Sequence, residues 1–260
     1  MTTSNHSQFN KYYKAHCKHL KLKELQPKTI DAYSRAIRRI GDYFDHKIDA
    51  LTHDELLDYF HELLERLSWS AVKLDLYGLK FFYIHVLKKS LDSIPVIKAP
   101  KVTRIPDILT VDEAQRLFMT TRKLSYRVFY FTLYSMGLRL GEGIRLRVSD
   151  IDAKRQRVHI RNAKGNRDRL VPLPAMTLHI LREFWQLHRH PSFIFPNRHR
   201  GLENAHLATS PMNREGVQST ISKVTREMGL KKKLLAILYA TAMPRIYLKP
   251  GLICLSFKNT

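Results

Sequence analysis

The sequence has few cysteines and no long apolar run. Cys17 and Cys254 are the two cysteines of its 260 residues. Two such distant cysteines indicate neither a disulfide framework nor a cysteine metal site. No apolar stretch approaches the roughly 20 residues that span a bilayer, and the N-terminus lacks the pattern of a secretory signal. We therefore expect no membrane partner and a cytoplasmic, bacterial protein.

Acidic residues are also scarce. The chain has 23 Asp and Glu against 45 Lys and Arg, a formal net charge of +22, and the basic residues are spread along its whole length. Such an excess opposes compaction unless a polyanion offsets it, so nucleic acid is the expected partner. Among the 13 histidines, His188 and His190 stand in a His-Arg-His run that we interpret as basic surface, and we predict no metal and no cofactor.

The first 94 residues predict a helical module. Residues up to about Leu25 suggest a short, partly ordered helix, and apolar residues at three- and four-residue spacing from Ile30 to Phe44 predict the next. Thr52 is the expected N-cap of a third helix with acids in its first turn, and a fourth begins near Ser68. The aromatic residues of the fourth helix are interpreted as core.

A basic linker is predicted at 95–106. Three prolines occur there together with Lys98, Lys101 and Arg104. Because proline fixes φ and removes an amide donor, the segment is expected to be extended. Its three cations either contact DNA phosphates or belong to an ordinary hinge between domains.

The second domain is predicted at 107–260. A capping box begins at Thr110, an apolar run covers 127–134, and two alternating strands at 157–161 and 167–173 flank a turn. Amphipathic helices are expected at 175–188 and 214–228. The predicted fold class is mainly α with a small antiparallel β-sheet.

Two side chains in this domain are candidates for phosphate chemistry. Arg139 comes after a glycine break at Gly137 and has Glu142 at helical spacing, so that a carboxylate can hold the guanidinium in one orientation. Alternatively, Arg139 caps a helix C-terminus and Glu142 lies on a solvated face. Lys164 lies on the hairpin turn, where it either projects an ammonium towards a nucleic acid or is a solvated turn lysine.

The run from Gly137 to Asp152, with Gly-Leu-Arg, then Glu, then Leu-Arg-Val-Ser-Asp-Ile-Asp, resembles the arginine box of tyrosine recombinases, the phage-integrase family. The hairpin sequence Ala-Lys-Gly-Asn-Arg-Asp-Arg-Leu-Val-Pro-Leu is similar to that family's hairpin. The resemblance implies an N-terminal core-binding domain and a mixed α+β catalytic domain. It also implies that Arg139 binds the scissile phosphate, that Glu142 supports it, and that Lys164 is the general acid. Arg161 and Arg167 on the hairpin are expected to contact DNA.

The resemblance implies a reaction as well. In the family, a tyrosine hydroxyl attacks a DNA phosphodiester and forms a 3′-phosphotyrosyl link without a metal, while two arginines and a histidine stabilise the charge that develops. Double-stranded DNA is then the partner, and the family assembles as a tetramer. Whether this chain forms a homo-oligomer is left open.

The pattern breaks after Lys233. The family's His-x-Leu-Arg-His box and tyrosine nucleophile are missing from 234–260, and neither Tyr239 nor Tyr247 has the family's surroundings, so no nucleophile is assigned. A shifted reading of codons from Ala236 to Asn259 permits His-Ser-Leu-Arg-His-Ser-Tyr-Ala-Thr-His. We therefore hypothesise a frameshifted gene whose nucleophile is encoded beyond Thr260.

Three functions remain open from the sequence. The first is a recombinase by descent that binds DNA but cleaves it poorly or not at all. The second is a non-catalytic double-stranded DNA-binding protein, and the third is a helical RNA-binding module, for which the sequence offers no aromatic platform motif.

Overall fold

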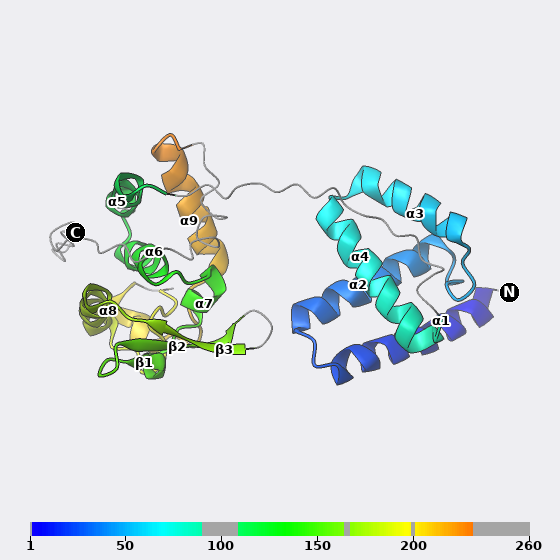
Figure 1. Cartoon of the computed structure of the whole chain (residues 1–260), viewed down its shortest axis with the longest axis horizontal. Helices are drawn as coiled ribbons and strands as arrows, with labels where there is room; N and C mark the ends of the chain where they lie inside the picture. The colour runs from blue at the N-terminus through cyan, green and yellow to red at the C-terminus, as the bar shows by residue number, and fades with distance from the viewer. Residues whose placement is uncertain (1, 90–108, 164–166, 199–200, 231–260) are drawn as a thin grey trace. The chain divides into compact units, whose positions relative to one another are not determined.

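The structure is a computed structural model that describes residues 2–89, 109–163, 167–198 and 201–230. The chain divides into two compact units, Met1–Thr103 and Arg104–Thr260 (Figure 1). The predicted domain limits at 94 and 106 fall outside the described residues and stay predictions. The predicted fold class, mainly α with a small antiparallel sheet, is confirmed.

Helices make up the described part of the first unit. They are α1 (Thr2–Leu22), α2 (Pro27–Tyr43), α3 (His53–Arg66), α4 (Trp69–Phe82) and the π-helix η1 (Tyr83–Leu87). The apolar stripes read from the sequence meet in one core that includes Ile37, Phe60 and Leu79. Helix α1 has 21 residues, so the expectation of a short, partly ordered helix was wrong. Phe9 of α1 belongs to this core and Tyr13 packs against it, so that both residues attach α1 to the other helices.

One glycine sets the spacing of α2 and α4. A Cβ on Gly78 would lie 3.0 Å from the Cβ of Ala36 and 3.1 Å from the Cα of Tyr33. The second contact is with backbone, which cannot yield as a flexible side chain does. The two helices therefore approach as closely as they do because position 78 carries no side chain.

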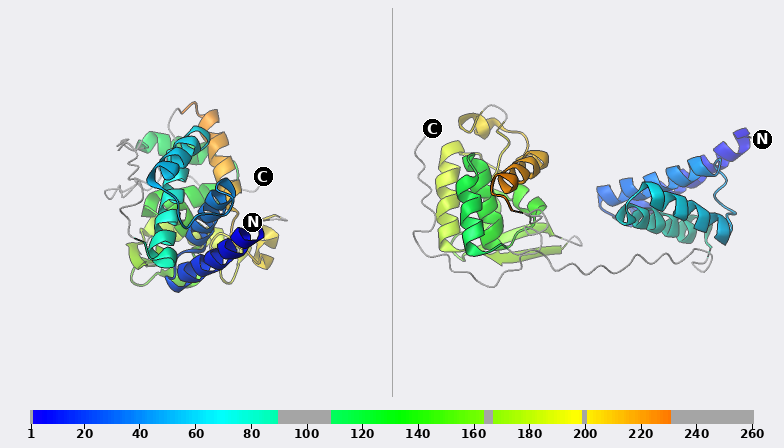
Figure 2. Two further views of the ribbon diagram at one scale, coloured as in Figure 1. Left: turned by 90° about the vertical axis from the view of Figure 1, so that its right-hand side faces the viewer. Right: turned by 90° about the horizontal axis from the view of Figure 1, so that it is seen from above.

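The second unit combines helices with a three-stranded sheet. Its helices are α5 (Val111–Thr120), α6 (Leu124–Met136), α7 (Leu140–Ile144), α8 (Ala175–His188) and α9 (Arg214–Glu227), with 3-10 helices η3 (Val148–Asp150) and η4 (Glu203–Leu207). The strands are β1 (Ile151–Asp152), β2 (Arg157–Ala163) and β3 (Arg167–Pro172). Helices α6 and α8 lie side by side (Figure 2).

Helix α6 forms the centre of the second unit. Residues Val128 to Tyr134 are all buried, so this helix is apolar on every side, as expected for an element enclosed by others. The hydroxyl of Tyr130 donates to the backbone oxygen of Val217 at 2.7 Å and ties α6 to α9. The turn at the C-terminal end of α6 is therefore attached to the most buried element of this unit.

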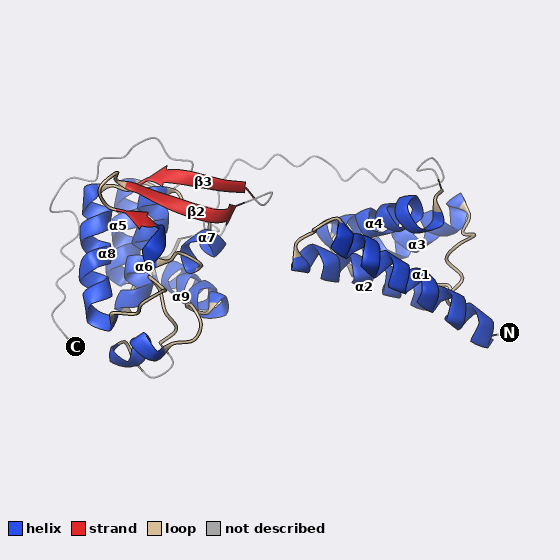
Figure 3. Ribbon diagram, turned by 90° about the horizontal axis from the view of Figure 1, so that it is seen from below, coloured by secondary structure: helices blue, strands red, loops and turns tan. Residues whose placement is uncertain are grey.

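The sheet is antiparallel, in the order β1-β2-β3, and lies along one side of these helices (Figure 3). Val158 pairs with Val171 and Ile160 with Arg169, and the register shifts between Ile160 and Ala163. Val158, Ile160 and Val171 are buried in the core. By the alternation of a strand, Arg169 lies on the same, helix-facing side as Val171.

Two histidines occupy places that their sequence context did not indicate. His188 and His190 are 2% and 4% exposed, so the interpretation as basic surface was wrong. The Nδ1 of His190 accepts the backbone amides of Ser192 at 3.0 Å and Phe193 at 2.8 Å. Its Nε2 then carries the proton and donates to the backbone oxygen of Ala208 at 2.9 Å. The buried ring thus satisfies backbone polar groups of the loop that follows α8.

Candidate functional site

A sharp turn after α6 presents Arg139 to solvent. Helix α6 ends at Met136, and Gly137 takes the left-handed conformation, with φ 60°, that closes many helices. Leu138 and Leu140 are 0% and 1% exposed, so the residues on both sides of Arg139 are fixed in the core. The side chain of Arg139 is 42% exposed. The turn therefore holds the backbone of Arg139 rigidly while its guanidinium faces outward.

Glu142 lies beneath this guanidinium and is almost fully buried. Arg139 is the N-cap of α7, and the Oε2 of Glu142 accepts its backbone amide at 2.9 Å. The Oε1 accepts Nη1 of the same arginine at 2.9 Å. The side chain of Glu142 is 3% exposed. The alternative, a C-terminal cap and a solvated glutamate, is thus wrong.

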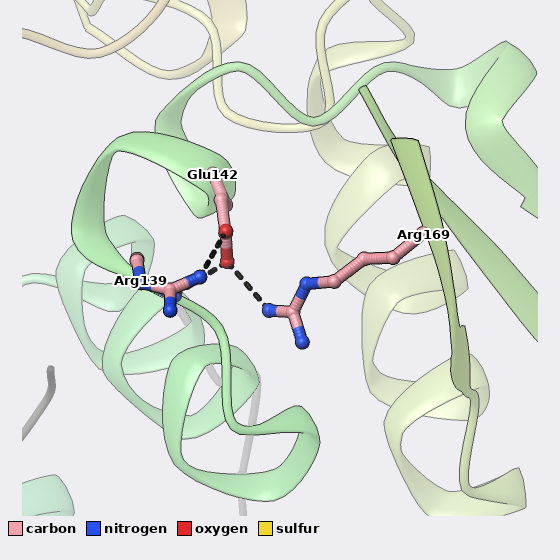
Figure 4. A network of polar contacts seen from close by, with 3 residues as sticks. All are labelled: Arg139, Glu142 and Arg169. Carbon is pink, nitrogen blue, oxygen red and sulfur yellow. Dashed lines mark hydrogen bonds and ion pairs between the residues drawn. The ribbon is translucent and has the colours of Figure 1, made fainter. Parts of the chain in front are cut away.

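A second arginine shares this carboxylate. Nη2 of Arg169, which comes from β3, donates to the Oε2 of Glu142 at 2.8 Å (Figure 4). Its side chain is 40% exposed. Arg169 was not among the predicted site residues, although its position two residues before the buried Val171 was a signal. We call Arg139, Glu142 and Arg169 the arginine cluster.

The arginine cluster keeps Glu142 ionised. Burial favours the neutral acid, but hydrogen bonds from the Arg139 amide and from the guanidinium groups of Arg169 and Arg139 outweigh it, so the pKa of Glu142 lies below its ordinary value. Two guanidinium groups against one carboxylate leave a surplus of one positive charge. Each guanidinium has further N–H donors for an oxyanion, and two neighbouring ones suit a phosphate.

A second buried carboxylate holds the other strand of the hairpin. The Oδ1 of Asp150 accepts Nε of Arg161 at 2.5 Å, and its Oδ2 accepts the backbone amide of Arg147 at 3.0 Å. Asp150 is buried, while the Arg161 side chain is 49% exposed. Both strands are therefore tied by arginines to the segment that carries Arg139.

The structure describes some of the remaining predicted site residues. Arg167 begins β3 and is exposed. Lys164, Lys98, Lys101 and Arg104 lie outside the described residues, so their roles stay predictions. Over the described ranges, no three His, Cys, Asp or Glu side chains come together as a possible metal site. The helices that the structure describes include none that is long and apolar enough to cross a membrane.

Comparison with known families gives the arginine cluster its context. Residues 107–237 match the phage integrase family, and residues 12–93 match the N-terminal SAM-like domain of phage integrases. The chain belongs to the phage integrase family. Arg139, Glu142 and Arg169 all lie within the first match.

Relatives of this integrase-family chain carry matching names. The protein y4qK of Sinorhizobium fredii, named for an integrase/recombinase, is 27% identical over 74% of this chain and 61% of its own length. A tyrosine recombinase of Thermosipho africanus is 28% identical over 70% of this chain and 68% of its own length. The chain thus spans about three fifths of the length of y4qK.

The fold of this integrase-family chain also has solved counterparts. A lambda integrase tetramer bound to a Holliday junction superposes with a TM-score of 0.66 at 16% identity. The match covers 85% of this chain and 64% of the lambda integrase chain. At this identity the similarity establishes the fold alone.

Proposed function

We propose that this chain takes part in site-specific DNA recombination and binds double-stranded DNA, with the guanidinium of Arg139 on a backbone phosphate. The observation that carries the proposal is the arginine cluster, in which a buried, ionised carboxylate orients a half-exposed arginine. A fixed guanidinium binds the non-bridging oxygens of a phosphate without the entropy cost of ordering a free side chain.

Three further observations support this function. The net charge of +22 favours a polyanionic partner. The relatives are named for integrases and recombinases, and the lambda integrase of similar fold is bound to a DNA junction. Lys164, Lys98, Lys101, Arg104, Arg161 and Arg167 are proposed as additional DNA contacts, with Lys164 as the general acid.

The same proposal includes weak or absent strand cleavage by the chain as it stands. Residues 234–260 carry neither the His-x-Leu-Arg-His box nor a tyrosine in the family's surroundings. Without the arginine and the histidines of that box, the negative charge that develops on the phosphate lacks most of its stabilisation. The second candidate, a non-catalytic double-stranded DNA-binding protein, rests on this departure.

Two measurements test the proposed function. In a competition assay, labelled duplex DNA bound to the full chain should be displaced by unlabelled duplex and much less by single-stranded RNA; preferential displacement by RNA would contradict the proposal. Incubation with suicide DNA substrates tests the proposed loss of cleavage. A covalent protein–DNA adduct would overturn that loss and exclude the non-catalytic protein, whereas no adduct together with tight duplex binding is the expected result.

A further inference from the structure

The orientation of Arg139 depends on a carboxylate that Arg139 does not hold alone. Its guanidinium contacts the Oε1 of Glu142, whereas the Oε2 accepts the Arg139 amide and Nη2 of Arg169. Rotation of the carboxyl group would break all three contacts at once. The hydrogen bond from Arg169 to Glu142 therefore helps to fix the orientation of the Arg139 guanidinium.

Burial makes this second cation necessary. An ionised carboxylate that is 3% exposed loses nearly all of its hydration, which disfavours its charged form. Arg139 supplies one guanidinium and one amide, and the amide is neutral. Arg169 supplies a second full positive charge at 2.8 Å, from a strand rather than from the turn itself. Without the charge of Arg169, Glu142 would become protonated more readily or adopt another rotamer.

We propose that Arg169 is a positioning residue that acts through Glu142 to fix the guanidinium of Arg139 for phosphate binding. This inference rests on the proposed function of the arginine cluster as a phosphate site. It assigns the sheet a part in that site, since β3 sets the orientation of an arginine on a separate turn.

Double-mutant analysis distinguishes positioning from direct contact. The full chain is titrated with labelled duplex DNA at one salt concentration, using Arg139→Ala, Arg169→Met and the double variant. Methionine keeps an unbranched apolar stem but removes the donors. Loss of Arg139 should weaken binding about tenfold, as expected for a charge-assisted contact. Arg169→Met should lose a similar factor, and the double variant should lose no more than Arg139→Ala.

Two controls separate positioning from charge. Arg122→Ala removes an arginine whose side chain is 84% exposed and paired with Glu227 at 2.9 Å, so it reports the loss of one surface charge. Glu142→Gln removes a negative charge, which by electrostatics alone would strengthen DNA binding. The positioning role predicts weaker binding instead. Arg169→Lys, which restores the charge and a donor, should recover at least half of the affinity lost, on a logarithmic scale.

The possible outcomes are distinct. If Arg169→Met binds as well as Arg122→Ala does, or if the double variant is much weaker than Arg139→Ala, the positioning role is wrong. Tighter binding by Glu142→Gln also overturns it. If Arg139→Ala itself matches Arg122→Ala, the proposed phosphate site fails, and the inference fails with it. Should Arg169→Met not fold, as judged by its thermal melt, Arg169→Lys and Glu142→Gln decide the question.

Discussion

Glu142→Gln is the most informative stability change, because it keeps the size of the side chain and removes its charge. A glutamine has one acceptor oxygen. With that oxygen at the Oε2 position, the bonds from the Arg139 amide and from Arg169 survive. The amide NH2 then faces Nη1 of Arg139, donor against donor, where the carboxylate accepted at 2.9 Å. The variant thus detaches the Arg139 guanidinium and weakens the bond that remains with Arg169.

The expected loss can be worked out from these contacts. A hydrogen bond to a charged group contributes about 1.5–3 kcal/mol. The Arg139 and Arg169 side chains are 42% and 40% exposed, so water offsets part of what each loses. We expect Glu142→Gln to lower the free energy of unfolding of the second unit by about 2 kcal/mol at pH 7.

The stability difference between wild type and Glu142→Gln should depend on pH in a defined direction. The folded-state pKa of Glu142 lies below the ordinary value of 4.5, because the hydrogen bonds from Arg139 and Arg169 outweigh the effect of burial. Its stabilising contribution is therefore complete above pH 4.5 and is lost as the pH falls through the folded-state pKa. The difference between wild type and Glu142→Gln should shrink in acid.

Urea denaturation monitored by tryptophan fluorescence measures this difference. The chain has two tryptophans, and in a Trp69→Phe background the signal comes from Trp185 in α8 of the second unit. The matched control is Glu227→Gln, whose carboxylate also meets an arginine at 2.9 Å but is 49% exposed, and it should change stability by less than about 0.5 kcal/mol. Equal effects of the two variants at pH 7, or a loss at Glu142 that persists undiminished in acid, would refute the reasoning.

Three further changes test the packing around the site and in the first unit. Gly143→Ala should destabilise the second unit by about 1–3 kcal/mol in urea denaturation, because the new Cβ would lie 2.4 Å from Cδ2 of buried Leu133. Gly141→Ala is the control and should be tolerated, because its Cβ meets only the end of the Arg145 side chain, at 3.2 Å. Thr110→Ala removes the capping box of α5 and should cost about 1 kcal/mol in the same assay. Burial of His16 lowers its pKa from 6.5 to about 4, so the unfolded chain takes up a proton at this residue before the folded chain does. A fall from pH 7 to pH 4 should therefore destabilise the first unit by about 3 kcal/mol. His16→Phe should abolish this contribution in thermal melts.

Local signals allowed much of the fold to be predicted. The capping box of α5, the N-cap Thr52 of α3 and the hairpin strands each depend on residues close together in the sequence. The contact of Glu142 with Arg139 spans three residues and was predicted as a possibility for the same reason. Periodicity and capping therefore sufficed wherever the cause of a structure lies within one or two turns of chain.

The features that the sequence did not reveal depend on distant contacts. Arg169 is 27 positions from Glu142, and no local pattern indicates which buried carboxylate it meets. His190 follows His188 and Arg189, yet its ring is buried, and its Nδ1 accepts the backbone amides of Ser192 and Phe193. Helix α1 is long because its residues pack on α2 and α4, which offsets its weak local propensity. Phe9 lies against Gly41 of α2, and His16 meets the ring of Phe82 of α4.

The salt dependence of duplex DNA binding tests the central claim most directly. The logarithm of the binding constant of the full chain should fall linearly with the logarithm of salt concentration, and Arg139→Ala should reduce the slope by about 0.9, the loss of one phosphate contact. An unchanged slope for Arg139→Ala, or binding that does not depend on salt, would contradict the placement of a DNA phosphate at Arg139.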